Sequence, residues 1–190
     1  MQERARAAAR PHASVGQTMP ARLYTRDEQA RRDASPWTLV QGVLAPVQFA
    51  VFLLSVALVW RFLASGEGWY AATASIVVKT LLLYTIMITG SLWERDVFGR
   101  YLFARPFFWE DVVSIGVLAL HTVYLGALLS GIGSPREQMF IALAAYAAYL
   151  VNATQFLLKL RAARQQSASR RNDAPQTLAS PAAPAIGTAE

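Results

Sequence analysis

A chain of 190 residues that is 54% hydrophobic and only 16% charged has room for one small folded unit and two tails. The absence of cysteine excludes disulfides, thiolate catalysis and cysteine-based metal sites. With two histidines in the chain, we do not expect a transition-metal site built from protein ligands. The formal net charge of +6 gathers at the ends of the apolar runs. This distribution indicates membrane topology and anionic headgroups as partners of the basic residues, and it argues against nucleic acid.

The first residues predict a tail followed by a short helix. Residues 1–22 are rich in alanine and arginine without periodicity, which is typical of a flexible basic tail. Thr25 and Glu28 have the spacing of a capping box, so a surface helix is expected to run to about Ala34. Ser35 and Pro36 then fit the N-cap and first position of the next helix.

Four apolar runs predict transmembrane helices at about residues 37–60, 70–93, 112–135 and 138–158. About 20 apolar residues cross the hydrocarbon core, and a segment in lipid must be helical to satisfy its own backbone. Ser134 and Glu137 repeat the capping pattern before the fourth run. We therefore expect an all-α membrane protein, an up-down four-transmembrane-helix bundle over residues 23–163 with a disordered tail over residues 164–190.

The distribution of arginine and lysine predicts the orientation of this bundle. They gather in residues 1–36, between the second and third runs, and after the fourth run, so both termini are expected in the cytoplasm. Gln41, Asn152 and Gln155 then fall in the cytoplasmic half of their spans. This one-sided polar lining favours a pocket open to the cytoplasm over a channel, and four spans without a repeat do not suggest a transporter.

Two charged or titratable residues lie inside the apolar runs, where a charge costs about 2.5–3.5 kcal/mol on insertion scales. Lys79 is near the middle of the second run. It is either a cation for an anionic ligand group or a lysine that snorkels or is paired internally. His121, near the middle of the third run, is a proton carrier, an axial ligand to a metal held by a bound tetrapyrrole, or a neutral core histidine.

Carboxyl groups bracket the connection between the second and third runs. Glu94 and Asp96 precede it, and Glu110 and Asp111 follow it. Near an apolar layer the pKa of a carboxyl group rises, and two carboxyls that share a site divide into an acid and a base. The alternative is ordinary interface chemistry, in which the acids complement a helix dipole or pair with nearby arginines. Glu110 and His121 share one helix face roughly 16 Å apart, so they could contact opposite parts of one large flat ligand.

Aromatic residues are concentrated in the same connection. Seven of them lie within residues 93–109, among them Trp93 and Trp109 at its two ends. An aromatic belt at the membrane interface explains this concentration, and so does a stacking surface for a planar macrocycle. Composition does not separate the two interpretations.

Several blocks of sequence go further than composition. They are RRDASPWTLVQGVLAPVQF at 31–49, ATASIVVKT at 72–80, WERDVFGRYLF at 93–103, FFWEDV at 107–112 and LHT at 120–122. In this order they resemble the 3-vinyl bacteriochlorophyllide hydratase family, also named 2-vinyl bacteriochlorophyllide hydratase, over about residues 23–163. The resemblance implies a hydro-lyase of bacteriochlorophyll biosynthesis in the inner or intracytoplasmic photosynthetic membrane. It would add water to the C3 vinyl group of a chlorophyllide or bacteriochlorophyllide, giving a 3-(1-hydroxyethyl) group.

The implied chemistry needs no redox cofactor and no protein-bound metal, because magnesium is part of the tetrapyrrole substrate. We expect Glu110 to be the general acid, with Glu94 or Asp111 orienting the water as base. His121 would be the axial ligand of the magnesium. Lys79, Arg100 or Arg105 would hold the propionate carboxylate of the substrate. Trp93 and Trp109 would stack on the face of the macrocycle.

Partners other than the substrate are expected to be membrane lipid, other enzymes of the same pathway and a second copy of the chain. The alternative function is a non-catalytic tetrapyrrole-binding scaffold for pigment assembly. It would use His121 and the aromatic residues but would not need the carboxyl groups.

Overall fold

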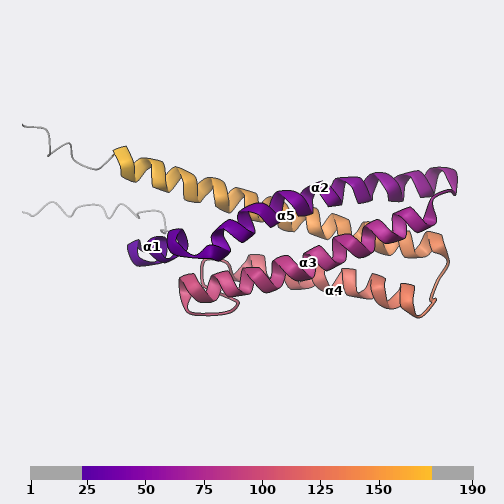
Figure 1. Ribbon diagram of the computed structural model, residues 1–190, viewed down its shortest axis with the longest axis horizontal. Helices are drawn as coiled ribbons and strands as arrows, with labels where there is room; N and C mark the ends of the chain where they lie inside the picture. Colours follow the sequence, from indigo (N-terminus) through magenta and orange to yellow (C-terminus); the bar gives the residue numbers. More distant parts are fainter. Residues whose placement is uncertain (1–22, 173–190) are drawn as a thin grey trace, which may run out of the picture.

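The computed structural model of the chain describes residues 23–172, which contain helices and no strand. The helices are α1 (Arg26–Ala34), α2 (Pro36–Ser65), α3 (Trp69–Phe98), α4 (Phe108–Leu129) and α5 (Pro135–Asn172). Figure 1 shows α2 to α5 running along the long axis, with α1 at one end. Each of these four helices is long and apolar enough to cross a membrane. The predicted all-α fold with four spans is confirmed, whereas the expected tail over residues 1–22 lies outside the described residues.

The helices extend beyond the predicted spans at α2 and α3, which end at Ser65 and Phe98, and differ from them most at α4 and α5. α4 begins at Phe108 and ends at Leu129, earlier at both ends than the predicted run 112–135. It ends there because Gly131 and Gly133 follow in left-handed conformations, with φ of 64° and 79°, that suit glycine. α5 continues to Asn172, past the predicted start of the tail at 164, and residues 173–190 of that tail lie outside the described residues. The alanine, arginine and glutamine residues beyond 160 are good helix formers, which explains the extension.

The helix caps show which of the predicted local hydrogen bonds form in the fold. Thr25 and Glu28 form the predicted capping box, with amide-to-oxygen distances of 2.7 and 3.2 Å. Ser134 and Glu137 form another, at 2.7 and 3.3 Å. Ser35 occupies the N-cap of α2, but its hydroxyl caps no amide of that helix and instead donates to Asp96 at 2.9 Å. A tertiary bond to the end of α3 has replaced the predicted local one.

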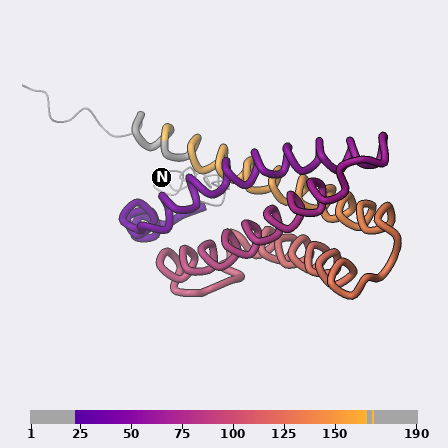
Figure 2. Tube along the Cα trace, turned by 45° about the vertical axis from the view of Figure 1, so that its right-hand side comes forward, coloured from indigo at the N-terminus to yellow at the C-terminus, as the bar shows by residue number. Residues whose placement is uncertain are grey.

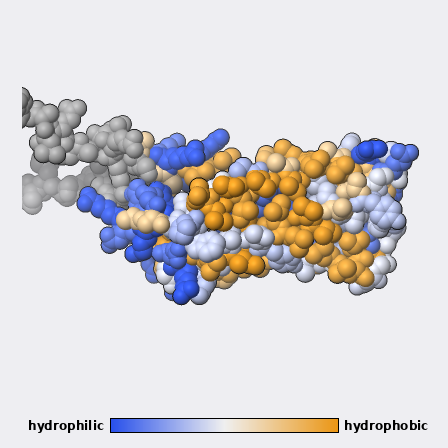
Figure 3. All heavy atoms as spheres, viewed as in Figure 1, coloured by the Kyte–Doolittle hydropathy of each residue, from blue (hydrophilic) through white to orange (hydrophobic). Residues whose placement is uncertain are grey.

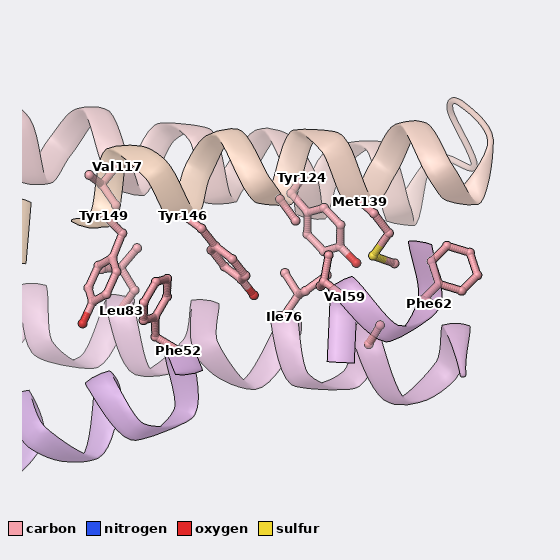
Figure 4. Packing of buried hydrophobic residues seen from close by; sticks show 12 residues of the cluster. Phe52, Val59, Phe62, Ile76, Leu83, Val117, Tyr124, Met139, Tyr146 and Tyr149 are labelled. Atoms are coloured by element: carbon pink, nitrogen blue, oxygen red, sulfur yellow. The ribbon is translucent and has the colours of Figure 1, made fainter. Parts of the chain in front are cut away.

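The four long helices form two hairpins, α2 with α3 and α4 with α5. Contacts are dense within each hairpin and sparse between them, and Figure 2 traces the chain through both hairpins. The seam between the hairpins holds the core. In Figure 4, Phe52 and Leu83 of the first hairpin face Tyr146 and Tyr149 of the second. The Phe52 ring lies 5.5 Å from that of Tyr146 and 4.9 Å from that of Tyr149.

The outer surface of the bundle is apolar along most of its length. Large side chains such as Leu39, Leu54, Val123 and Leu150 are exposed on it, and Figure 3 shows the hydrophobic surface between two more polar ends. A helix that is apolar on all sides is typical of a membrane span, where lipid covers the outer face. Polar side chains are dense at the end that carries α1, the connection 99–107 and the last turns of α5, which we call the α1 end (Figure 1).

Candidate active site

Three carboxyl groups are buried together at the α1 end of the bundle. Glu94 comes from the last turns of α3, and Glu110 and Asp111 come from the first turn of α4. Their exposed fractions are 4%, 6% and 4%, although all three lie at or beyond the ends of the apolar runs. Carboxyl groups are almost never so buried without specific partners. The predicted candidates for acid–base chemistry are therefore brought to one place.

The connection 99–107 supplies two of these partners. The Phe103 amide donates to Asp111 at 2.7 Å, and the next amide, that of Ala104, donates to Glu94 at 3.1 Å. Phe103 holds φ of 60°, a left-handed conformation that costs of order 1–3 kcal/mol for a bulky residue. Consecutive amides in such a bend form a concave anion-binding nest. The strained bend thus aims both amides at the carboxyl groups and places these groups beside each other.

Glu94 and Asp111 are neighbours at this bend, because the two amides that donate to them are consecutive in the chain. An ionised carboxylate can only accept hydrogen bonds, so a bond between two carboxyl groups requires a proton on one of them. Two carboxyl groups buried this close together favour sharing one proton, because two charges there would repel each other. In such a pair one carboxyl group can act as a general acid and the other as a general base.

Glu110 has a different partner. Its carboxylate lies 2.7 Å from Nζ of Lys159 on α5, and the side chain of Lys159 is only 27% exposed. The same ammonium lies 4.8 Å from the ring centroid of Phe107. This ion pair engages the Glu110 carboxylate with a cation, so the expected role of general acid fits Glu110 less well than it fits the Glu94–Asp111 pair.

The aromatic residues of 93–109 separate into two groups. Trp93, Phe98 and Phe107 pack on one another with ring centroids 5.5 to 5.9 Å apart, and Trp93 donates to Thr38 at 3.0 Å. Trp109 is 69% exposed and contacts the neighbouring Phe108 ring on the outer face. The predicted stacking surface thus divides into an inner cluster, which holds the end of α3 in place, and an outward belt.

The two arginines of the connection lie apart from the carboxyl groups. Arg100 and Arg105 are exposed. Sequence reasoning grouped them with Lys79 as alternative holders of a carboxylate, but their surroundings differ from that of Lys79. A carboxylate bound by either arginine would stay in contact with water, where an ion pair contributes little.

A second polar centre lies deeper, in the seam between the hairpins. Lys79 of α3 and His121 of α4 are both fully buried. Nζ of Lys79 lies 3.5 Å from the ring centroid of Tyr149 and has no hydrogen-bond partner among the described residues. Polar groups in this position are functional candidates by default, because lipid offers no compensation for them.

The orientation of His121 leaves one ring nitrogen free. Nδ1 lies 2.8 Å from the carbonyl oxygen of Val117, which can only accept, so Nδ1 carries the hydrogen. In the neutral ring, Nε2 then keeps its lone pair, and it has no partner among residues 23–172. A carbonyl that fixes the tautomer through Nδ1 is the usual support of a metal-binding histidine.

Sequence reasoning missed three residues of these centres. Lys159 was the first charge beyond the fourth predicted span, but nothing in the sequence identified Glu110 as its partner. Tyr146 and Tyr149 are three residues apart on α5, so they share one helix face. Ordinary core residues have the same spacing, so the sequence did not single them out. Tyr146 bonds Ser55 of α2 through its hydroxyl, so it joins the two hairpins.

Fold and site together define a polytopic membrane protein with a buried carboxyl cluster at one end and a buried lysine and histidine between its hairpins. The family model for 2-vinyl bacteriochlorophyllide hydratase matches residues 24–162. A protein of that name from Rhodobacter capsulatus is 66% identical over 147 residues, which are 77% of this chain and 85% of the relative. The chain belongs to the 2-vinyl bacteriochlorophyllide hydratase family, as its sequence motifs predicted.

A second relative of the same name, from Cereibacter sphaeroides, is 65% identical over 144 residues, covering 75% of this chain and 89% of the relative. No solved structure matches the chain. The matched residues 24–162 include both polar centres and leave out most of the terminal regions.

Proposed function

We propose that this protein is a hydratase that adds water across the C3 vinyl group of a chlorophyllide or bacteriochlorophyllide during bacteriochlorophyll biosynthesis. The product is the 3-(1-hydroxyethyl) derivative, and the enzyme is a hydro-lyase. The observation that carries this proposal is membership of a family whose relatives bear that name at 65–66% identity. The four apolar helices suit a substrate that partitions into membranes.

The reaction can proceed with acid–base groups alone. A proton is delivered to the terminal vinyl carbon, and the resulting positive charge on the inner carbon spreads into the conjugated macrocycle. Water then adds to the inner carbon and gives up a proton, so the number of protons on the enzyme is restored. The two electrons of the vinyl π bond form the new C–H bond, and a lone pair of water forms the C–O bond. No redox cofactor is required by this sequence of steps.

The carboxyl cluster provides the groups that these steps need. The Glu94–Asp111 pair holds one proton to give, and after giving it the pair can accept the proton that water releases. We assign the acid to this pair and not to Glu110, because Glu110 is held by Lys159. Glu110 is the neighbouring fixed carboxylate and would orient the attacking water.

We further propose that Nε2 of His121 ligates the magnesium at the centre of the substrate. The support for this role is a buried nitrogen whose tautomer is set by Val117 and whose lone pair has no partner. Glu110 and His121 are eleven residues apart on α4, roughly 16 Å along the helix, and both are buried. This separation is on the scale of a tetrapyrrole with its substituents, so one substrate could reach both centres.

The proposed location is the bacterial inner membrane or its intracytoplasmic extension, with the α1 end in the cytoplasm. The basic residues near the ends of α1 and α5 support this orientation under the positive-inside rule. The substrate, lipid and a second copy of the chain are the proposed partners, together with enzymes that make the substrate or oxidise the new hydroxyl.

A conversion assay tests the function. Purified protein in nanodiscs, given chlorophyllide a without added cofactor, is expected to yield a pigment heavier by one water, with a blue-shifted red absorption band. The shift follows because hydration removes the vinyl group from the conjugated system. Mass spectrometry and absorption spectroscopy follow the product. Folded protein that binds the pigment and leaves its mass unchanged would contradict the proposal and favour a pigment-binding scaffold.

The role of His121 is tested by binding alone. His121→Ala is expected to weaken binding of the magnesium pigment by about tenfold, equivalent to about 1.4 kcal/mol, and to leave binding of the magnesium-free pigment unchanged. Added imidazole should restore the lost affinity by occupying the vacated position. Fluorescence titration in nanodiscs measures the dissociation constants of both pigments. Equal losses for the two pigments would refute ligation.

A further inference from the structure

The geometry points to Lys79 as the residue that receives the propionate carboxylate of the substrate, inside the seam between the hairpins. This inference rests on the proposed function for the identity of the ligand. A chlorophyllide carries a free propionate because it lacks the esterifying alcohol of the finished pigment. Lys79 would therefore fix which edge of the macrocycle lies deep in the bundle, and so which edge the carboxyl cluster can reach.

Lys79 is a buried amine with no counter-ion among residues 23–172. Its exposed fraction is 0%, and its Nζ has no hydrogen-bond partner among the described residues. Among the described residues, its Nζ contacts the face of the Tyr149 ring, at 3.5 Å from the centroid. A ring face attracts a cation but offers no lone pair in a hydrogen-bonding position, so the ammonium's capacity to donate remains unused. An anionic oxygen group would use it.

Unpartnered polar atoms from both hairpins accompany Lys79. Two of them are Oε1 of Gln48 on α2 and Nε2 of His121 on α4. Buried polar groups are normally paired, and several unpaired ones in the same seam indicate a polar ligand that binds there. Contacts between the hairpins are sparse, so this seam is also where the bundle can part most easily. The aromatic rings of Phe52, Tyr146 and Tyr149 line it and suit a planar apolar ligand (Figure 4).

The alternative holders of the carboxylate are less well placed. Arg100 and Arg105 are exposed on the connection 99–107, where a carboxylate would keep its water and gain little from pairing. Lys79 is shielded from water, so a carboxylate there gains a charge-assisted bond of the stronger kind. The magnesium proposed for His121 and the carboxylate proposed for Lys79 belong to the same molecule, which agrees with the location of both residues in one seam.

The experiment compares chlorophyllide a with its propionate methyl ester, which has lost the charge and gained one methyl group. Binding of each is measured by fluorescence titration in nanodiscs of zwitterionic lipid, which removes competition from anionic headgroups. Wild-type protein is expected to bind the free acid about 10- to 100-fold more tightly than the ester, as for one hydrogen-bonded buried charge. Lys79→Met is expected to bind the two pigments equally. The matched control, Arg105→Gln, should keep the wild-type preference.

The inference is overturned if folded Lys79→Met keeps the full preference for the acid, or if Arg100→Gln or Arg105→Gln abolishes it. Lys79→Gln provides a second neutral variant if Lys79→Met does not fold, with the same expected loss of preference. None of these measurements depends on turnover. If the acid preference depends on Lys79 while no water is ever added, the binding site stands and the hydratase proposal fails, so the two outcomes are distinguished.

Discussion

Replacing Glu94 by glutamine is expected to lower the rate of vinyl hydration by about 10²–10⁴-fold, the usual contribution of a positioned acid–base group. Glutamine keeps the size of the side chain and can still accept from the Ala104 amide, which lies 3.1 Å away in the wild type. It cannot share an acidic proton with Asp111. The fold and pigment binding are therefore expected to survive while proton delivery fails.

This result is measured as initial turnover at saturating chlorophyllide, with pigment binding determined in the same preparation. Glu67→Gln is the matched control, because Glu67 is exposed in the turn at the opposite end of the bundle. Asp111→Asn should reproduce the loss, since the proposed mechanism draws its proton from the two carboxyl groups together. Normal turnover by folded Glu94→Gln would remove the pair from the mechanism, and the acid would have to be sought elsewhere.

Replacing Lys159 by methionine is expected to lower the free energy of unfolding by about 3 kcal/mol, the lower end of the cost of breaking a buried ion pair. Glu110 is only 6% exposed and lies 2.7 Å from the Lys159 ammonium, so the substitution leaves a buried carboxylate without its cation. The lower end applies because the Lys159 side chain keeps 27% exposure.

Denaturation in mixed micelles, followed by circular dichroism, measures this loss. The double variant Lys159→Met/Glu110→Gln should recover most of the stability, because it removes the uncompensated charge as well. Arg161→Gln changes an exposed residue two positions along α5 and should leave stability nearly unchanged. If Lys159→Met were as stable as Arg161→Gln, the ion pair would not be a determinant of the fold.

Sequence patterns predicted the architecture well where the decisive interaction is local. Hydropathy identified all four membrane-spanning helices, because lipid forces each apolar run to satisfy its own backbone. The capping boxes at Thr25 and Ser134 formed because their partners are three residues away. Ser35 did not cap its helix, because Asp96 on another helix competes for its hydroxyl. The extent of α5 was underestimated, since a polar composition was interpreted as disorder.

The sequence predicts which carboxyl residues form the candidate site, but it does not predict their hydrogen-bond and ion-pair partners. Glu94, Glu110 and Asp111 stood out as acids at span ends, and their common location follows from helices that meet at one end. Which carboxyl pairs with which partner depends on how α3, α4 and α5 are rotated, which periodicity alone does not determine. The bend at Phe103 is likewise a tertiary feature, held by Asp111 from the next helix.

The most direct test of the central claim is conversion of chlorophyllide a by the purified protein in deuterated, oxygen-18-labelled water, with no cofactor added. We predict one deuterium in the methyl group and one oxygen-18 on the inner carbon of the new 1-hydroxyethyl group. Fragment mass spectrometry and proton NMR locate the two labels. A product without these labels, or a requirement for an added reductant or oxidant, would contradict acid–base hydration by this chain.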